Sequence, residues 1–302
     1  MHDFATLGGP VLERLPDRGA KLALNEVISM PEADWEPWDG NSYIRAGHGD
    51  AVWMRATLPN PTRETLHGIV ADSEYFPDHV QAWVQSDTGE WRMMHSGEAL
   101  RGSEKAIWAR TAAFPVSVPA GGDRVIYLRA EDYYFVYLRP RWWPRAEEYH
   151  AAQTRDMMAE MICYGGLMAL VIYNLILWAR LRFSDTGCYV LYAAGATIFN
   201  LVSNGVPALF GIAMGSPWKE MTVTGALSLS GVFLLQFGRI FLGTESAMPR
   251  VDRLLRWLRG GLIVLTLGVP AMPWMNGLQW LSATVISLTL VHAVLLTVPA
   301  VA

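Results

Sequence analysis

The order of hydrophobic and polar residues changes once along the chain, near residue 146. Before that point, short segments alternate apolar and polar residues, which is typical of strands with one buried face. Turn-forming Pro, Gly, Asn and Asp residues separate these segments. Candidate strands lie at Ala51–Leu58, Leu66–Ala71, Val80–Gln85, Trp91–Met94, Ile107–Phe114, Arg124–Ala130 and Phe135–Arg139, with another near Leu22–Ile28. Residues 1–146 are therefore predicted to be an all-β domain, folded as a jelly-roll-like sandwich of two sheets.

After residue 146 the pattern predicts an α-helical transmembrane bundle. Residues 147–160 are polar and are expected to lead as a helical linker into residues 161–179, which carry no formal charge. A helix of that length spans roughly 30 Å of hydrocarbon at about 1.5 Å per residue. Further apolar segments follow at about 186–206, 221–242, 260–275 and 278–302, which gives about five spans. Because the last span reaches Ala302 without a polar tail, we expect a C-terminal truncation.

The arginines between the spans predict which side of the membrane each loop occupies. The loops after the second and fourth spans hold only Lys219. The loops after the first and third spans are rich in arginine: Arg180, Arg182, Arg239, Arg250, Arg253, Arg256 and Arg259. Basic loops stay in the cytoplasm, so the β domain is expected on the opposite, extracytoplasmic side of the membrane. The last four arginines recur at three-residue steps, as on a helix face that contacts anionic lipid headgroups.

Composition separates the two halves in the same way. Residues 1–150 carry 15 Lys and Arg against 22 Asp and Glu, a net charge of −7, which disfavours nucleic acid as a partner. Both cysteines, Cys163 and Cys188, lie in the apolar half, so the β domain contains no disulfide. No phosphate-binding loop, dinucleotide-binding turn, nucleophile elbow or zinc spacing is present. We therefore expect no cofactor, no metal and no enzyme activity in this chain.

Aromatic and arginine side chains of the β domain are the candidate ligand-binding residues. Trp53 and Arg55 share a sheet face, where they would hold a sugar or a carboxylate, although an arginine stacked on a structural tryptophan is the favoured interpretation. Flat aromatic rings with a polar edge suit sugar rings. Arg110 and Arg129 would contact an anion if both face one cleft. The candidate set is Arg55, Trp83, Trp108, Arg110, Arg129 and Tyr134.

Acidic residues give an alternative interpretation. The segment Asp72–His79 matches no calcium-binding spacing and is expected to be a solvated loop. Glu131 or Asp132, together with Asp72 or Glu74, would supply the two carboxylates of a glycosidase. Nothing in the sequence fixes the separation of these carboxylates.

Three asparagines interrupt or end the apolar segments. Asn174, Asn200 and Asn204 are expected to form hydrogen bonds across helices first, and to line a path through the membrane second.

Four segments taken together resemble one family. Gly49–Asn60, Arg110–Ala130, Tyr164–Tyr192 and Phe237–Leu258 are similar to the bacterial seven-transmembrane receptors with diverse intracellular signalling modules, joined to their type-2 extracellular domain. The resemblance runs from about Leu22 to the end of the chain.

The resemblance implies a sensory receptor of the bacterial inner membrane, with the β domain in the periplasm. Its extracytoplasmic domain would bind a small ligand, by family resemblance a carbohydrate, and its helices would relay the signal through the lipid bilayer. It also implies a homodimer. The family's sixth and seventh spans and its cytoplasmic kinase or cyclase domain have no counterpart in this sequence. Two alternatives stay open, namely a membrane-anchored glycosidase or esterase, and a truncated binding or scaffold protein that does not signal.

Overall fold

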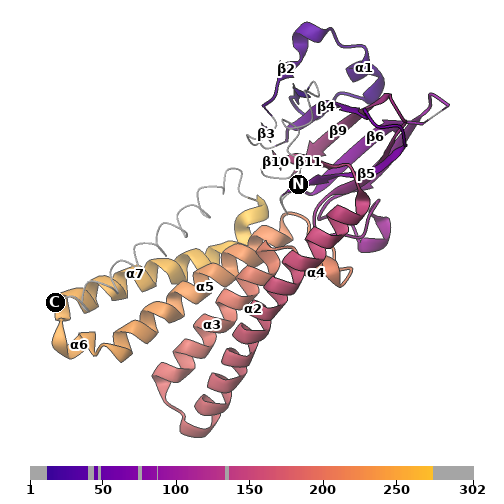
Figure 1. Cartoon of the computed structure of the whole chain (residues 1–302). Coiled ribbons are helices and arrows are strands. Elements are labelled where there is room, and N and C mark those ends of the chain that lie inside the picture. Colours follow the sequence, from indigo (N-terminus) through magenta and orange to yellow (C-terminus); the bar gives the residue numbers. More distant parts are fainter. Residues whose placement is uncertain are drawn as a thin grey trace. The chain divides into compact units, whose positions relative to one another are not determined.

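The computed structural model describes residues 12–39, 44–46, 49–73, 77–86, 88–132 and 136–274 (Figure 1). The chain divides into two compact units. The first comprises Met1–Asp156 and Asn204–Ser216, and the second comprises Met157–Ser203 and Pro217–Ala302. Antiparallel strands build the first unit and long helices build the second. The predicted fold class, a β-sandwich followed by a helical membrane region, is confirmed.

Within the described residues, three sheets form the first unit. The six-stranded sheet has the order β2 (Glu36–Pro37), β1 (Leu12–Asp17), β4 (Ala51–Pro59), β9 (Asp123–Glu131), β6 (His79–Gln85) and β7 (Trp91–Ser96). The three-stranded sheet has the order β11 (Pro140–Trp143), β5 (Leu66–Asp72) and β8 (Ala113–Val118), and a two-stranded sheet pairs β10 (Val136–Leu138) with β3 (Ile44–Ala46). Short 3₁₀-helices lie at η2 (Glu32–Asp34) and η3 (Gly102–Glu104).

The main core lies between the six-stranded and three-stranded sheets. Met54 and Leu58 of β4 pack there with Leu128 of β9, and the facing sheet contributes Phe114 and Trp142. The register sets this contact, since Met54 is paired with Leu128 across β4 and β9. Each fully buried side chain of this kind contributes roughly 1.5–3 kcal/mol. Alternation along the strands is therefore what joins the two sheets.

The six-stranded sheet is also buried on its outer face, because helix α1 (Leu24–Ile28) covers part of it. Trp53, which alternates with the core positions of β4, packs in this second cluster. The predicted strand at Leu22–Ile28 is therefore wrong. The backbone N–H of Ala23 donates to Glu26 Oε2 at 2.8 Å, a local capping bond that favours a helical turn over strand pairing.

The predicted strand at Ile107–Phe114 is displaced towards the C-terminus. The observed strand, β8, contains Pro115 and lies at the edge of its sheet. An edge strand tolerates proline because the missing N–H faces away from the ladder. Trp108 and Arg110 consequently lie in an irregular segment before the strand, where their side chains are available for other contacts.

Four helices of the described chain are long and apolar enough to cross a membrane: α2 (Ala146–Leu181), α3 (Ser184–Ser203), α5 (Trp218–Phe241), and α7 (Pro249–Gly268) with η4 (Val269–Trp274). Two short helices connect them, α4 (Val206–Leu209) and α6 (Thr244–Ala247). The fifth predicted span, 278–302, lies outside the described residues.

Helix α2 is continuous from the sandwich into the first span. It has 36 residues, which corresponds to about 54 Å at 1.5 Å per residue. Its first turns belong to the first unit, where Tyr149 is 1% exposed and packs against Ile69, Ala71 and Ala113. The ring of Trp143 meets Tyr149 edge-on at 5.8 Å between centroids. The expected polar linker is therefore the beginning of a helix anchored in the sandwich.

Helices α3 and α5 pack closely through small residues. A Cβ on Gly195 would lie 3.0 Å from the backbone oxygen of Ala226, so the two backbones approach closely and a side chain larger than hydrogen would be crowded there. The hydroxyl of Ser230 donates to the backbone oxygen of Tyr192 at 3.0 Å. This hydrogen bond links the two helices within the membrane unit.

Helix α7 begins at Pro249, well before the apolar segment predicted at 260–275. Hydropathy marks only the apolar part of the helix, whereas proline at the first position and Asp252 in the first turn favour an earlier start. Arg250, Arg253, Arg256 and Arg259 therefore lie on one helix that continues into the span.

Candidate functional site

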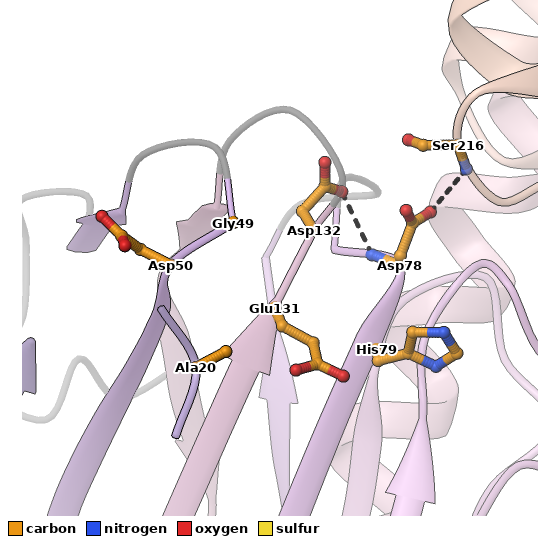
Figure 2. A pocket seen from close by; sticks show the side chains of 8 residues that line it. All are labelled: Ala20, Gly49, Asp50, Asp78, His79, Glu131, Asp132 and Ser216. Carbon is orange, nitrogen blue, oxygen red and sulfur yellow. Dashed lines mark hydrogen bonds between the residues drawn. The ribbon is translucent and has the colours of Figure 1, made fainter. Parts of the chain in front are cut away.

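A cavity of about 290 Å³ opens at one end of the six-stranded sheet (Figure 2). The strand register brings the lining residues together, because it pairs Glu131 of β9 with Ala51 of β4 on one side and with His79 of β6 on the other. The start of β4, the end of β9 and the start of β6 thus meet at one edge. The lining residues are Ala20, Gly49, Asp50, Asp78, His79, Glu131, Asp132 and Ser216.

Arg129 bonds to two residues of the cavity lining, Glu131 and Ala20. Its Nη1 lies 2.8 Å from Glu131 Oε2, and its Nη2 donates to the backbone oxygen of Ala20 at 3.2 Å. The turn that carries Ala20 is fixed further by Gly19, whose N–H donates to Asp50 Oδ1 at 2.8 Å. Charge-assisted bonds of this kind hold the wall more firmly than neutral ones.

Asp78 connects the cavity to a segment distant in sequence. Its backbone N–H donates to Asp132 Oδ2 at 3.2 Å, and its Oδ1 accepts the backbone N–H of Ser216 at 2.7 Å (Figure 2). Asp78 is 6% exposed and Asp132 is 9% exposed. Two buried carboxylates are thus positioned by backbone donors, one of which comes from residues 204–216.

Carboxylates dominate the electrostatics of the cavity. Its lining includes four acidic side chains, and His79 is its only basic lining residue. The ring of His79 lies 5.3 Å from that of His95. Burial first, and then the neighbouring His79, lower the pKa of His95 below its ordinary value. The site therefore accepts hydrogen bonds and disfavours additional negative charge.

The segment 204–216, which we call the strap, lies on the sandwich and belongs to the first unit. Trp108 Nε1 donates to the backbone oxygen of Ala208 at 2.9 Å, and Arg110 Nη1 donates to that of Asn204 at 3.4 Å. Two predicted membrane spans, α2 and α3, separate the sandwich from the strap in sequence. An even number of crossings returns the chain to the same side, so the contact agrees with the topology predicted from the arginines.

Among the described residues, the predicted ligand-binding side chains do not lie in one cleft. Arg55 contacts Glu13 and lies over the ring of Trp35, 4.7 Å from its centroid. Trp83 stacks on Trp53, with 4.9 Å between ring centroids. Arg129 bonds to Ala20 and Glu131 of the cavity lining, whereas Trp108 and Arg110 bond to the strap. Tyr134 lies outside the described residues.

The acidic segment differs from the solvated loop that the sequence suggests. Asp72 is 5% exposed, and its Oδ1 accepts the backbone N–H of Arg139 at 2.9 Å. Asp78 is buried too, so the solvated-loop interpretation is wrong for both. Asp72 does not line the cavity, and Glu74 lies outside the described residues, so the described residues show neither expected glycosidase pair there.

Sequence reasoning missed Asp50 and Asp78 as members of one site with Asp132. A signal was available, because each of these residues lies at or beside the end of a predicted strand. In an antiparallel sheet, the start of one strand meets the end of its neighbour, and acidic residues at those positions converge.

Two of the predicted polar residues of the membrane half donate to the backbone of their own helix. The side-chain amides of Asn174 and Asn200 donate to the backbone oxygens of Leu170 and Ala196, at 2.9 and 2.8 Å. Asn204 lies in the strap rather than in a span. The guanidinium of Arg182 lies 5.7 Å from the ring of Trp178, and Arg180 is in the last turn of α2.

The described part of the chain contains no group of three or more His, Cys, Asp or Glu residues that could hold a metal ion.

Comparison with known proteins yields two matches to family models. A model described as 7TMR-DISM extracellular 2 matches residues 9–143, and one described as 7TM diverse intracellular signalling matches residues 156–301. The first covers the sandwich and the second covers the membrane helices. No curated protein matches the chain.

Proposed function

We propose a ligand-sensing function from the premise that the chain belongs to the 7TMR-DISM family, the seven-transmembrane receptors with diverse intracellular signalling modules. It is a multi-pass membrane protein with an amino-terminal extracellular domain, and it is a sensory module of the receptor type. The proposal is that the cavity beside Asp78 binds a small ligand, and that the membrane helices relay the bound state to a cytoplasmic output domain.

The cavity lining supports a ligand rich in hydrogen-bond donors. Carboxylate oxygens accept hydrogen bonds, and Asp50, Asp78, Glu131 and Asp132 each contribute a carboxyl group to the lining. Sugar hydroxyls and protonated amines match this requirement. A carboxylic acid does not, because its own charge would be repelled and the guanidinium of Arg129 is directed at Glu131. The observation that carries the proposal is that two buried carboxyl groups, those of Asp78 and Asp132, line one end of the sheet together with the partly exposed Asp50 and Glu131.

The size of the cavity limits the ligand further. Binding sites for drug-sized molecules occupy about 300–1,000 Å³, and this cavity of about 290 Å³ lies at the lower limit. A single sugar ring or a small polyamine fits that volume better than an oligosaccharide does. We therefore propose a monosaccharide, an amino sugar or a small amine as the ligand class.

Isothermal titration calorimetry on the full chain in lipid nanodiscs tests the proposal. The panel contains glucose, glycerol, glucosamine, putrescine and acetate. We expect binding from glucosamine or another donor-rich compound and none from acetate. Because a hydrogen bond to a charged group contributes about 1.5–3 kcal/mol, Asp132→Asn should weaken binding about tenfold or more.

Asp123→Asn is the matched control, because Asp123 is exposed at the opposite end of β9. It should leave the affinity unchanged. Binding of acetate alone, or equal weakening by both variants, would contradict the proposal. Turnover of a nitrophenyl glycoside by the same sample would instead identify a glycosidase.

A further inference from the structure

We infer that the strap, residues 204–216, transmits the state of the cavity to helices α3 and α5, and that Asp78 is the residue that couples the two. This inference rests on the proposed function, since it assigns to the same cavity a route into the membrane. The strap is continuous in sequence with both helices. It follows α3, which ends at Ser203, and it precedes α5, which begins at Trp218.

The first half of the strap is held by two side chains of the sandwich. Trp108 donates to the backbone oxygen of Ala208, and Arg110, which is 3% exposed, donates to that of Asn204. The ring of Trp108 also packs on Gly102, where a Cβ would lie 2.6 Å from the indole. Gly102 thus leaves room for the indole, and this packing in the sandwich positions the Trp108 donor that binds the strap.

The second half of the strap is held where the loop after β7 meets the start of β6. The backbone N–H of Met214 donates to the backbone oxygen of Glu98 at 3.0 Å. Gly215 lies so close that a Cβ on it would be 2.6 Å from the Cβ of Ala99. The next N–H, that of Ser216, is the one that Asp78 accepts. Three consecutive strap residues are thus in contact with the sandwich.

This corner of the sandwich is a tightly linked piece of backbone. The N–H groups of Glu98 and Ala99 donate to the backbone oxygens of Pro77 and Asp78, both at 3.1 Å. Gly97 has φ +131°, and a Cβ on it would lie 2.2 Å from the backbone oxygen of Asp78. Only glycine permits that approach. A displacement of Asp78 therefore also displaces Glu98 and Ala99, and it changes the hydrogen bonds that hold Met214 and Ser216 of the strap.

Asp78 belongs to the cavity and to the strap at the same time. Its side chain lines the cavity, while its Oδ1 accepts the N–H of Ser216. A ligand whose donor binds Oδ1 from the side of Ser216 competes with that N–H for the same oxygen. A ligand shifts a conformational equilibrium only through its difference in affinity between two states. Competition for Asp78 supplies that difference, because the ligand binds better when the strap is released.

The strap then acts on a helix pair that is already joined. Gly195 and Ser230 hold α3 against α5, so a displacement at the strap is applied to both helices together. Cys188 lies in the first turns of α3, at the end opposite the strap, and provides a native thiol that reports on this movement.

The test uses Trp108→Phe in the full chain, with Cys163→Ser as background, in lipid nanodiscs. Phenylalanine removes the donor to Ala208 and leaves the cavity intact. Losing one hydrogen bond should raise amide exchange of the strap roughly fivefold by mass spectrometry. The rate of Cys188 labelling by a membrane-permeant maleimide should change by a similar factor. The affinity for glucosamine measured by calorimetry should rise by up to the same factor, because the ligand binds better when the strap is released.

Two further variants make the test specific. Gly215→Ala perturbs the strap from its own side and should reproduce both effects, whereas Trp91→Phe, which alters a tryptophan packed on Tyr127, should produce neither. Unchanged Cys188 labelling in Trp108→Phe and Gly215→Ala, despite faster strap exchange, would overturn the inference. Absence of glucosamine binding in every form would count against the proposed ligand, and the labelling result would still decide the relay.

Discussion

The cytoplasmic ends of α5 and α7 are joined by Asp252, and replacing it with asparagine should destabilise the membrane unit. Asp252 is 0% exposed. It accepts from Arg239 Nε at 2.7 Å and Nη2 at 3.2 Å, from Thr244 Oγ1 at 2.9 Å and from Arg256 Nε at 3.0 Å. Asparagine keeps the shape, but it removes the charge and places an amide donor against a guanidinium.

The loss of unfolding free energy depends on how exposed the side chain of each arginine partner is to solvent. The side chain of Arg256 is 51% exposed, so it is solvated again when the carboxylate is lost. That of Arg239 is 11% exposed and would stay buried without its counterion. Removing one partner of a buried ion pair costs about 3–5 kcal/mol. Because part of Arg239 reaches solvent, we expect Asp252→Asn to lower the free energy of unfolding by about 3 kcal/mol.

Urea unfolding in detergent micelles, followed by circular dichroism, measures this difference. Glu245→Gln is the control, since Glu245 and Asp252 line one cavity of about 490 Å³ beside Arg239 and the Glu245 side chain is exposed. Asp252→Leu combined with Arg239→Leu should recover most of the loss, because an apolar pair replaces a buried ion pair at little cost. A value for Asp252→Asn within about 0.5 kcal/mol of the original protein would refute the reasoning, since surface substitutions give no more than that.

Three other predictions concern the two units separately. Tyr149→Ala should cost the sandwich about 3–5 kcal/mol in urea unfolding because it opens a cavity under the start of α2, and Tyr149→Phe should cost far less. Gly195→Leu should separate α3 from α5 and lower the melting temperature in micelles, because its Cβ meets the backbone of Ala226. The lowered pKa of His95 means that the unfolded chain binds more protons, so stability is full above about pH 6.5 and falls at lower pH. Thermal unfolding between about pH 5 and 8 should show this slope, and His95→Gln should flatten it.

The sandwich and the membrane helices could be predicted because each follows a simple period. Alternation in Ala51–Leu58 and Arg124–Ala130 reflects the side chains of one sheet face, and β4 and β9 lie there. Uniform apolarity in 161–179 marks α2 in the same way. Alternation cannot show that a second layer covers the opposite face, so the role of Leu22–Ile28 as a covering helix was missed.

The candidate site was harder to predict because it depends on contacts between distant segments. Asp78 and Ser216 lie far apart in sequence, and Ser216 belongs to a stretch of Gly and Pro that signals only a break between helices. Trp108 and Arg110 look like ligand-binding residues from composition, yet they bond to backbone oxygens of the strap. Residue type alone does not distinguish these two uses of a tryptophan or an arginine.

The bond between Ser216 and Asp78 is the point at which ligand sensing and signal relay meet, and the amide of Ser216 reports on it directly. Hydrogen exchange of the strap peptide should be measured in the full chain with and without saturating glucosamine. Competition for the Asp78 carboxylate predicts faster exchange at Ser216 and Met214 when glucosamine is bound. Slower or unchanged exchange at both amides, in a sample in which calorimetry shows the cavity to be occupied, would contradict the account.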